Sequence, residues 1–568
     1  MRPKSDPVST FYGTSLYDIV IPEDDFLRLL VITIDWQSIR KELMTDAEGQ
    51  PIVYSHTGRP AWDPLVIFKM LFLQRYQPAS DANVEKRAKT DLAYRFFLGV
   101  PIPQPVPDES TLSIYRTKWG DKKIDQVYKT IFKQIQGFGF AGVRKGVVGD
   151  ITHQHARIHK PSARVLIGNC FEQWIQEVRA LGKRFPHVFD LERLRLICFA
   201  VDAWFILYQE QIRTKQLSRK ERFALLVQKV LEVQQELALV ISIVEPIPGE
   251  VASSKEWRAY RKRKHTLVQI LDENVNISEE EDEKQKDKKE KQNEKNMQIN
   301  QKKGQRKIIS HVDPEARSGY KTKTKPFTGY KVVTSMTPDG FHPNVETVPG
   351  NVSDTTQAVP LVEKVKEKAD EMPEAIGLDL GFNSVKNRKD LHELGVQPGI
   401  ELERPINPRN PKMFSTSDFQ LDFGPLSVTC PADQTTTKVT PVEKTEKLVF
   451  RFSKDICDRC PLKAKCTSSK TGRTVQFSQL IPLLEIDRQF LETDQYDWLR
   501  RTRWRLEGNL GHGKTSHSLA QTPYHGLEKT SFHNRMVFIV LNLKRLIKLL
   551  YFPDLKMPPP VRRSGASA

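Results

Sequence analysis

Apolar residues recur at helical spacing through the first 140 residues of the chain. One helix opens at Asp63-Pro64 and repeats its apolar positions to Phe72, with proline in the first turn, where its missing N–H is tolerated. A second helical pattern covers residues 82–98, and a third starts at the cap-like Asp108. The end of the third helix is basic, since it carries Arg116, Lys118, Lys122 and Lys123. Short helices with basic ends are compatible with helix-turn-helix DNA binding, and equally with the solvated face of a helical bundle.

The pattern changes after residue 144. A short β-branched run, Gly146–Asp150, ends on a carboxylate, and long helical periodicity returns from residue 171 to about residue 244. Between residues 279 and 307 only Met297 and Ile299 are apolar. Such a stretch cannot bury enough surface to offset its ordering entropy, so it is interpreted as a linker or a solvated helix.

Strands return from residue 317 onwards. Residues 329–334 and 344–348 flank a Pro338-Asp339-Gly340 turn and predict a hairpin. Asp354 is interpreted as a helix cap and Asp313 as a turn acid. Further patterns predict a strand over 374–380 and helices over 354–365, 384–394, 483–514 and 527–550. This order of elements predicts an α/β core that carries helical and β insertions.

Composition narrows the class of protein. The chain has 568 residues, enough for two to five domains, with 88 Lys and Arg against 70 Asp and Glu, a net charge of +18. Such an excess indicates a polyanionic partner, most commonly nucleic acid. The six cysteines are few for a secreted disulfide scaffold, and the N-terminus lacks a signal-peptide pattern. Polar residues interrupt the most apolar stretch, residues 537–552, so this stretch is interpreted as an amphipathic helix and not as a membrane span. A soluble, intracellular, multidomain protein that meets nucleic acid is expected.

Three acidic residues are candidates for chemistry. Asp150 and Asp379 each end a short apolar strand, where ligands gather in open α/β sheets. Arg503, Glu507 and Lys514 fall within roughly a 40° arc of one helix. Carboxylates suit Mg²⁺, and two such ions can activate an oxygen nucleophile and neutralise a phosphodiester. From the residues alone, a turn role for each aspartate and a surface ion pair at Arg503 and Glu507 stay open.

Four of the cysteines form the pattern Cys430-x26-Cys457-x2-Cys460-x5-Cys466. This spacing, beside short strands, predicts a structural Zn²⁺ site of zinc-ribbon type; an iron–sulfur cluster and unligated cysteines are the alternatives. The other two, Cys170 and Cys198, lie in apolar helical patterns and are predicted to pack. His153, His155 and His159 follow Asp150, and contact with DNA or solvent is the interpretation for them.

The chain resembles bacterial insertion-sequence transposases that have an RNase H-like core and a DDE catalytic triad. The matching stretches are, in order, WDPLVIFKMLFL through DESTLSIYRTKW, VVGDITHQHA, HVDPEARSGYKTKTKPFTGYK, ETVPGNVSDT, IGLDLGFNS, RWRLEGNLGHGK and NLKRL. They cover most of the chain outside residues 171–307, and their order and context make the combination specific.

The resemblance implies roles for individual residues. Asp150, Asp379 and Glu507 match the triad that holds two Mg²⁺ ions, for which Mn²⁺ can substitute. Arg503 and Lys514 match the cations of the signature Tyr-x2-Arg-x3-Glu-x6-Lys, which implies contact with the DNA at the transposon end; Arg116 and Lys118 are further candidates for DNA contact. Arg500 stands where the signature has tyrosine, with Tyr496 one turn earlier, so a stacking role for that tyrosine is not carried over.

The resemblance also implies the organisation of the chain. We expect a helical DNA-binding domain (1–143), an RNase H-like catalytic core of mixed sheet (144–170, 308–412 and 482–552), a helical insertion with a charged linker (171–307), a Cys-rich zinc-ribbon-like insertion (413–481) and a tail (553–568). The expected function is that of a DNA transposase, which binds terminal inverted repeats and catalyses cleavage and strand transfer by 3′-OH attack. A homodimer on paired DNA ends, a cytoplasmic, nucleoid-associated location and no membrane contact are expected with it. A metal-dependent DNA nuclease and a catalytically silent DNA-binding derivative are the alternatives.

Overall fold

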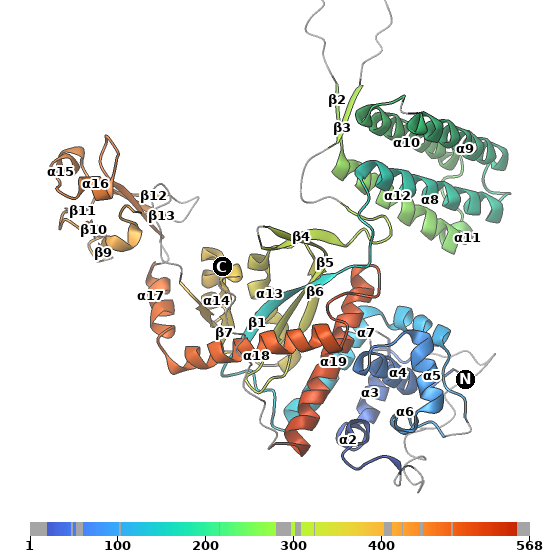
Figure 1. Ribbon diagram of the computed structural model, residues 1–568, viewed down its shortest axis with the longest axis horizontal. Coiled ribbons are helices and arrows are strands. Elements are labelled where there is room, and N and C mark those ends of the chain that lie inside the picture. The colour runs from blue at the N-terminus through green and yellow to red at the C-terminus, as the bar shows by residue number, and fades with distance from the viewer. Residues whose placement is uncertain are drawn as a thin grey trace, which may run out of the picture.

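Helices make up the N-terminal part of the chain (Figure 1). The computed structural model describes residues 17, 20–46, 49–52, 61–101, 104–214, 216–279, 297–301, 308–322, 324–402, 412–422, 424–442, 447–478 and 481–553. Its first helices are α2 (Phe26–Thr33), α3 (Trp36–Leu43), α4 (Pro64–Tyr76), α5 (Asp81–Thr90), α6 (Leu92–Leu98) and α7 (Glu109–Gly137). Each begins at an aspartate or serine whose side chain accepts a hydrogen bond from a first-turn N–H. The helical N-terminal region is therefore confirmed.

Two details of these helices differ from the sequence prediction. The single helix predicted over residues 82–98 is wrong, because Asp91 ends α5 and caps α6 by accepting from the Tyr94 N–H. The helix predicted from Asp108 is confirmed as α7, but it is interrupted at Gly120, whose φ of 59° and ψ of −170° are not helical. Glycine alone adopts that backbone conformation readily, so α7 consists of two segments joined at Gly120.

A mixed sheet forms the middle of the molecule, as predicted. Its strands are β1 (Val147–His155), β4 (Arg317–Thr322), β5 (Lys325–Met336), β6 (Val345–Pro349), β7 (Ala375–Leu378) and β8 (Gln397–Ile400). β5 pairs antiparallel with β1, β4 and β6, whereas β1, β7 and β8 run parallel to one another. The predicted hairpin is β5–β6, and Asp313 is a turn acid as predicted, since it accepts from the Ala316 N–H.

Helices connect and cover this sheet. They are α13 (Ala358–Ala369), α14 (Val385–Glu393), α17 (Ile481–Phe490), α18 (Asp494–Ser516) and α19 (Leu527–Tyr551). The cap role expected of Asp354 is wrong: it opens a 3₁₀ turn that precedes α13, no side chain caps that turn, and its carboxylate instead accepts from Lys331 Nζ at 2.7 Å.

The amphipathic character predicted for the C-terminal helix is also only half right. Residues 530–543 of α19 are buried on every side, because this helix lies between the sheet and the N-terminal helices α4 and α7 (Figure 1). One continuous hydrophobic cluster therefore joins the N-terminal helices, the sheet and α19.

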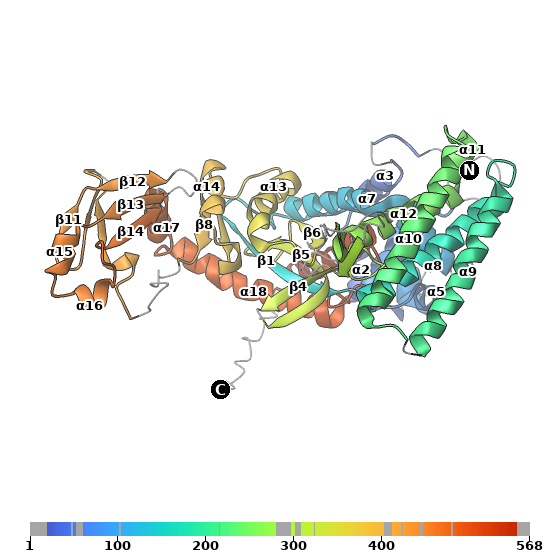
Figure 2. The same ribbon diagram turned by 90° about the horizontal axis from the view of Figure 1, so that it is seen from above.

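The helical insertion forms a second body with its own hydrophobic core (Figures 1 and 2). It contains α8 (Ala163–Arg184), α9 (Leu191–Arg213), α10 (Arg219–Ser242), α11 (Gly249–Ala252) and α12 (Lys255–Asn274). Cys170 and Cys198 are buried in this core, as predicted. The strands β2 (Val275–Glu279) and β3 (Met297–Gln301) pair beyond α12, so residues 297–301 form a strand, and the rest of the predicted charged linker, 280–296 and 302–307, lies outside the described residues.

A small β unit precedes α17. Its strands are β9 (Gln420–Asp422), β10 (Ser427–Thr429), β11 (Thr435–Thr436), β12 (Val439–Val442), β13 (Lys447–Arg451) and β14 (Thr474–Ser478), with the short helices α15 (Lys454–Asp458) and α16 (Lys463–Cys466). They form two three-stranded sheets around a core that includes Phe419, Phe450 and Phe452. The predicted tail lies outside the described residues except at Pro553. Among the described helices, none combines the length and the apolar character needed to cross a membrane.

Candidate active site

Asp150, within β1, and Asp379, directly after β7, lie side by side on two neighbouring strands in the interior of the sheet. β1 and β7 are parallel neighbours, and their register pairs Val148 with Gly377. Asp150 and Asp379 each follow their paired residue by two positions, so the two carboxylates leave adjacent strands at the same level. Asp379 directly follows β7, as predicted, but the prediction that Asp150 ends its strand is wrong: Asp150 is the fourth of the nine residues of β1, because pairing with β5 continues to His155.

Glu507 approaches these two acids from α18. This helix packs across β1 and β7, where Leu499 lies against the backbone of Gly377. The pKa of Asp150 is raised to about 6, chiefly by burial. The negative charges of Asp379 and Glu507 also raise this pKa, whereas a hydrogen bond from the Ile151 N–H lowers it. The three acids predicted from the sequence therefore act on one another electrostatically.

Cations surround the acids. Arg503 Nη2 lies 3.7 Å from Glu507 Oε1, one helical turn away, and the Arg503 guanidinium lowers the pKa of Asp150. Burial lowers the pKa of Lys514, and the positive charge of Lys321 lowers it further. The negative charge of Asp150 raises the pKa of Lys514. Arg503 and Lys514 therefore lie on either side of Glu507 along α18, and Lys321 extends the positive charge beyond the predicted residues.

The histidines after Asp150 lie on the Lys514 side. Burial and the positive charges of Lys514 and Lys321 lower the pKa of His153 to about 4, so its imidazole is neutral at pH 7. The rings of His153 and His155 pack around Phe327. This arrangement gives His153 a packing role beside the site.

Asp354 is a site residue that the sequence interpretation missed. A Cβ built on Gly381 would lie 3.0 Å from Asp379 Oδ1 and 3.4 Å from Asp354 Oδ2, so both carboxylates face this glycine. Lys331 Nζ donates to Asp354 and comes from β5, two strands away from Asp379. The only sequence signal was the position of Asp354 within the matching stretch ETVPGNVSDT, and its cap-like spacing concealed it.

A cavity of about 350 Å³ opens beside Asp379. The polar and aromatic side chains that line it are Glu401, Tyr496, Arg500, Arg503 and Trp504. Arg500, which stands in the place of a tyrosine, pairs with Asp497 at 3.1 Å, and the Trp504 side chain is 62% exposed. These side chains offer positive charge and aromatic surface beside Asp379.

The three acids form a donor set that suits a divalent cation. The negative charges of Asp379 and Glu507 raise the pKa of Asp150, so the three carboxylates repel one another. A divalent cation would relieve this repulsion, and a hard cation such as Mg²⁺ prefers the oxygen ligands that carboxylates provide. Among the described residues, no group of three or more Asp, Glu, His or Cys side chains is close enough together to hold a metal ion.

The four cysteines line a second, small cavity in the β unit. Burial raises the pKa of the Cys466 thiol, and the neighbouring Cys457, Cys430 and Cys460 raise it too. The Arg473 N–H donates to Cys457 Sγ at 3.4 Å. Cys430 therefore lines the same cavity as the three cysteines of residues 457–466, and a zinc site there stays a prediction.

Arg116 and Lys118, the two residues of α7 that are candidates for DNA contact, differ in their surroundings. The Arg116 side chain is 6% exposed, pairs with Asp81 at 2.7 Å and stacks over Tyr524, whereas Lys118 is exposed beside the Tyr115 ring. Burial gives Arg116 a packing role, and DNA contact by either residue stays a prediction.

Two family models match the chain. Residues 15–118 match the family described as "Transposase domain (DUF772)", and residues 429–547 match the "Transposase DDE domain". The first match ends two residues before the break at Gly120, and the second contains Glu507 and all four clustered cysteines. No curated protein and no solved structure matches the chain. The DDE family acts on nucleic acid by phosphoryl transfer and implies use of a divalent metal ion, typically Mg²⁺.

Proposed function

We propose, from the premise that this chain is an insertion-sequence transposase of the DDE type, that it cleaves the DNA at the ends of its element and joins the freed 3′-OH groups to target DNA. The observation that carries the proposal is the register of β1 and β7, which brings Asp150 beside Asp379 under the helix that bears Glu507. The strand order of β6, β5, β1, β7 and β8, three antiparallel strands followed by two parallel ones, supports an RNase H-like core.

Each residue has a proposed role in the reaction. Asp150, Asp379 and Glu507 hold the metal ions, and Arg503 orients Glu507 and binds a phosphate with its free edge. Lys514, which interacts electrostatically with Asp150, contributes positive charge for a second phosphate. When bound, two Mg²⁺ ions, or Mn²⁺ in their place, supply the activation of the attacking oxygen and the neutralisation of the leaving oxygen.

The test uses the DNA that flanks the gene as labelled duplex ends, with the purified chain, a target plasmid, and either Mg²⁺ or EDTA. We expect metal-dependent nicking and a joined product. In Glu507→Gln both fall at least about a hundredfold, because one charge that holds the metal is removed. Glu492→Gln is the matched control, since Glu492 is an exposed glutamate just before α18. Nicking without joining would identify a nuclease, and binding without cleavage would identify a silent DNA-binding derivative.

DNA binding by the N-terminal helices is a second part of the proposal. The net charge of +18 and the exposed Lys118 support it, and the terminal inverted repeats are the proposed binding sites. Removing one lysine that neutralises a phosphate reduces the slope of log affinity against log salt by about one. We expect that reduction for Lys118→Gln, measured with labelled repeat DNA over a range of salt concentrations. An unchanged slope would remove Lys118 from the interface. The proposed place of action is the bacterial nucleoid, where the DNA is.

A structural Zn²⁺ ion in the β unit is a third part. The shared cavity of Cys430, Cys457, Cys460 and Cys466 supports it. We expect close to one zinc per purified chain by elemental analysis and its loss in Cys460→Ser. Cys198→Ala, which alters a cysteine of the helical insertion, keeps the metal. Iron with a visible absorption band, or no metal, would contradict the proposal.

The expected domain boundaries are proposed with two changes. The helical insertion begins at α8, so residue 163 replaces residue 171 as its start. The shared hydrophobic cluster supports treating the N-terminal helices and the core as one unit for expression. A homodimer on paired ends is part of the proposed function as well.

A further inference from the structure

Helix α9 of the helical insertion carries two apolar faces. The inner face packs against α8 and α10 through Leu194, Ile197, Cys198, Val201 and Tyr208. The outer stripe consists of Leu196, Phe199, Ala200, Ala203, Ile206 and Leu207, all exposed. At about 100° per residue the two faces lie on opposite sides of the helix. A helix that covers a core normally has one apolar face and one polar face, so the outer stripe is unexplained by the insertion's own packing.

The large side chains of the outer stripe are strongly exposed. Leu196, Phe199, Ile206 and Leu207 are 63%, 72%, 69% and 65% exposed, and α9 lies at the periphery of the insertion in both views (Figures 1 and 2). At roughly 150–200 Å² for a whole side chain, these four alone leave about 400–500 Å² of apolar surface in one patch. A patch of that size is comparable to the largest apolar patch on an ordinary monomer, and such patches are often functional.

Five members of the outer stripe, all except Leu196, are placed symmetrically along the helix about Ala203. Ala200 and Ile206 lie three residues to either side of it, and Phe199 and Leu207 lie four residues to either side. Two antiparallel copies of α9 that cross at Ala203 would therefore place Phe199 of each copy beside Leu207 of the other. Small residues at the crossing point allow two helices to approach closely, and Ala203 and Ala200 are the small members of the stripe. This symmetry fits a second copy of the chain better than an unrelated partner, because an isologous interface must complement itself.

Charge and shape favour the antiparallel arrangement. Arg195 lies near one end of the stripe and Glu210 lies beyond the other, seven residues from Ala203, so antiparallel pairing brings opposite charges together and parallel pairing does not. Ile206 is one of the residues that line a groove of about 300 Å³ between α8 and α9. In the antiparallel pair, Phe199 of the second copy lies at the mouth of this groove.

The area is sufficient for a specific contact. Two stripes bury roughly 800–1,000 Å² of apolar surface, and their polar flanks bring the total above the roughly 1,000 Å² that a specific interface needs. We propose that the helical insertion is a self-association module, in which α9 of two chains pair antiparallel about a two-fold axis at Ala203. The inference concerns the chain without DNA, so it does not depend on the proposed chemistry.

The test measures the mass of the full chain in the absence of DNA by sedimentation velocity, at about 1 to 50 µM. We expect a dimer of twice the 65.4 kDa of one chain. Phe199→Arg is expected to raise the dimer Kd at least a hundredfold, since each of two buried aromatic side chains is replaced by a charge. Leu239→Arg is the matched control: Leu239 is 57% exposed on α10, outside the stripe, and its change leaves the dimer intact. Circular dichroism checks that both variants keep the helical content of the parent chain.

A cross-link tests the geometry. Ala203→Cys places two thiols at the symmetry axis, and mild oxidation is expected to give a disulfide-linked dimer on a non-reducing gel, above the background of the parent chain. Gln209→Cys, exposed on the same helix but away from the stripe, gives no more than that background. A monomeric parent chain, a dimer that persists in Phe199→Arg, a dimer formed only with DNA, or equal cross-linking of both cysteine variants would each overturn the proposal.

Discussion

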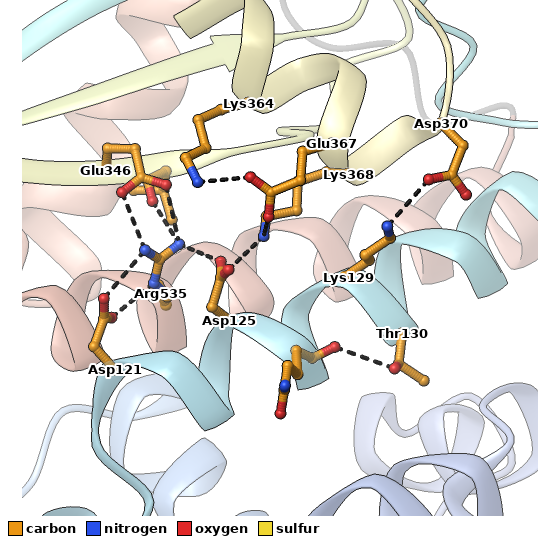
Figure 3. A network of polar contacts seen from close by, with 12 residues as sticks. Asp121, Asp125, Lys129, Thr130, Glu346, Lys364, Glu367, Lys368, Asp370 and Arg535 are labelled. Carbon is orange, nitrogen blue, oxygen red and sulfur yellow. Dashed lines mark hydrogen bonds and ion pairs between the residues drawn. The ribbon is translucent and has the colours of Figure 1, made fainter. Parts of the chain in front are cut away.

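Arg535 of α19 joins the N-terminal helices to the sheet through a buried cluster of charges (Figure 3). Its side chain is 5% exposed. Its guanidinium donates to Asp121 at 2.7 Å, to Asp125 at 2.5 Å and to Glu346 at 3.1 Å. Asp121 and Asp125 lie on α7 beyond the break at Gly120, and Glu346 lies on β6. One cation therefore connects three elements that are up to 414 residues apart in the sequence.

Arg535→Met removes this cation while keeping most of its volume. Three carboxylates then lose their shared partner, and the Val345 carbonyl loses a donor. Burial raises the pKa of Glu346 and the charge of Arg535 lowers it, so without Arg535 the ionised carboxylate is still less favourable. Breaking a buried ion pair by removing one partner costs about 3–5 kcal/mol, and Lys368, which also contacts Asp125, compensates only in part. We expect the lower part of that range.

The assay is native-state hydrogen exchange of the amides in α7 and α19. A loss of about 3 kcal/mol accelerates exchange through the opening of these helices by roughly a hundredfold. Arg144→Met is the control, because Arg144 and Glu374 form an ion pair with side chains 74% and 59% exposed, worth under about 1 kcal/mol. Adding Asp121→Asn to Arg535→Met should restore part of the protection. If Arg535→Met accelerates exchange no more than Arg144→Met does, the reasoning about the buried cluster is wrong.

Two further predictions concern the same part of the molecule. Gly120→Ala should destabilise the chain by about 1–3 kcal/mol, because a φ of 59° with a ψ of −170° suits only glycine. Gly137→Ala, in open space, should not lower the thermal midpoint. Burial lowers the pKa of His342 to about 3, so the folded chain keeps this imidazole neutral while the unfolded chain protonates near pH 6.5. Stability is therefore lost as pH falls from 6.5 towards 3, and His342→Gln should reduce the slope by about 1.4 kcal/mol per pH unit between pH 6 and 4. An unchanged slope in that variant, as expected for the exposed His187→Gln, would refute the burial argument.

Local patterns were enough to predict the elements that carry the candidate site. Asp150 and Asp379 were recognised because each ends a short apolar run, and such runs become β1 and β7 whatever the rest of the chain does. The same reasoning failed for Asp354, whose spacing to Gln357 imitates a helix cap. Its actual partner, Lys331, is 23 residues away on strand β5, and nothing in the local sequence distinguishes a cap from an ion pair of that kind.

The C-terminal helix shows the limit of such patterns most clearly. Its polar residues suggested a face towards solvent, yet Asn542 is buried and donates to the His342 carbonyl and the Tyr128 hydroxyl, 200 and 414 residues away. The two contacts together require α7, the turn between β5 and β6, and α19 to be in place, since an unpaired buried amide would destabilise the core. The polar residues of α19 therefore specify which helices meet across the sheet, while its apolar residues only make it a helix that is buried. It follows that the N-terminal helices, although they match a family model of their own, depend on the end of the chain for their packing.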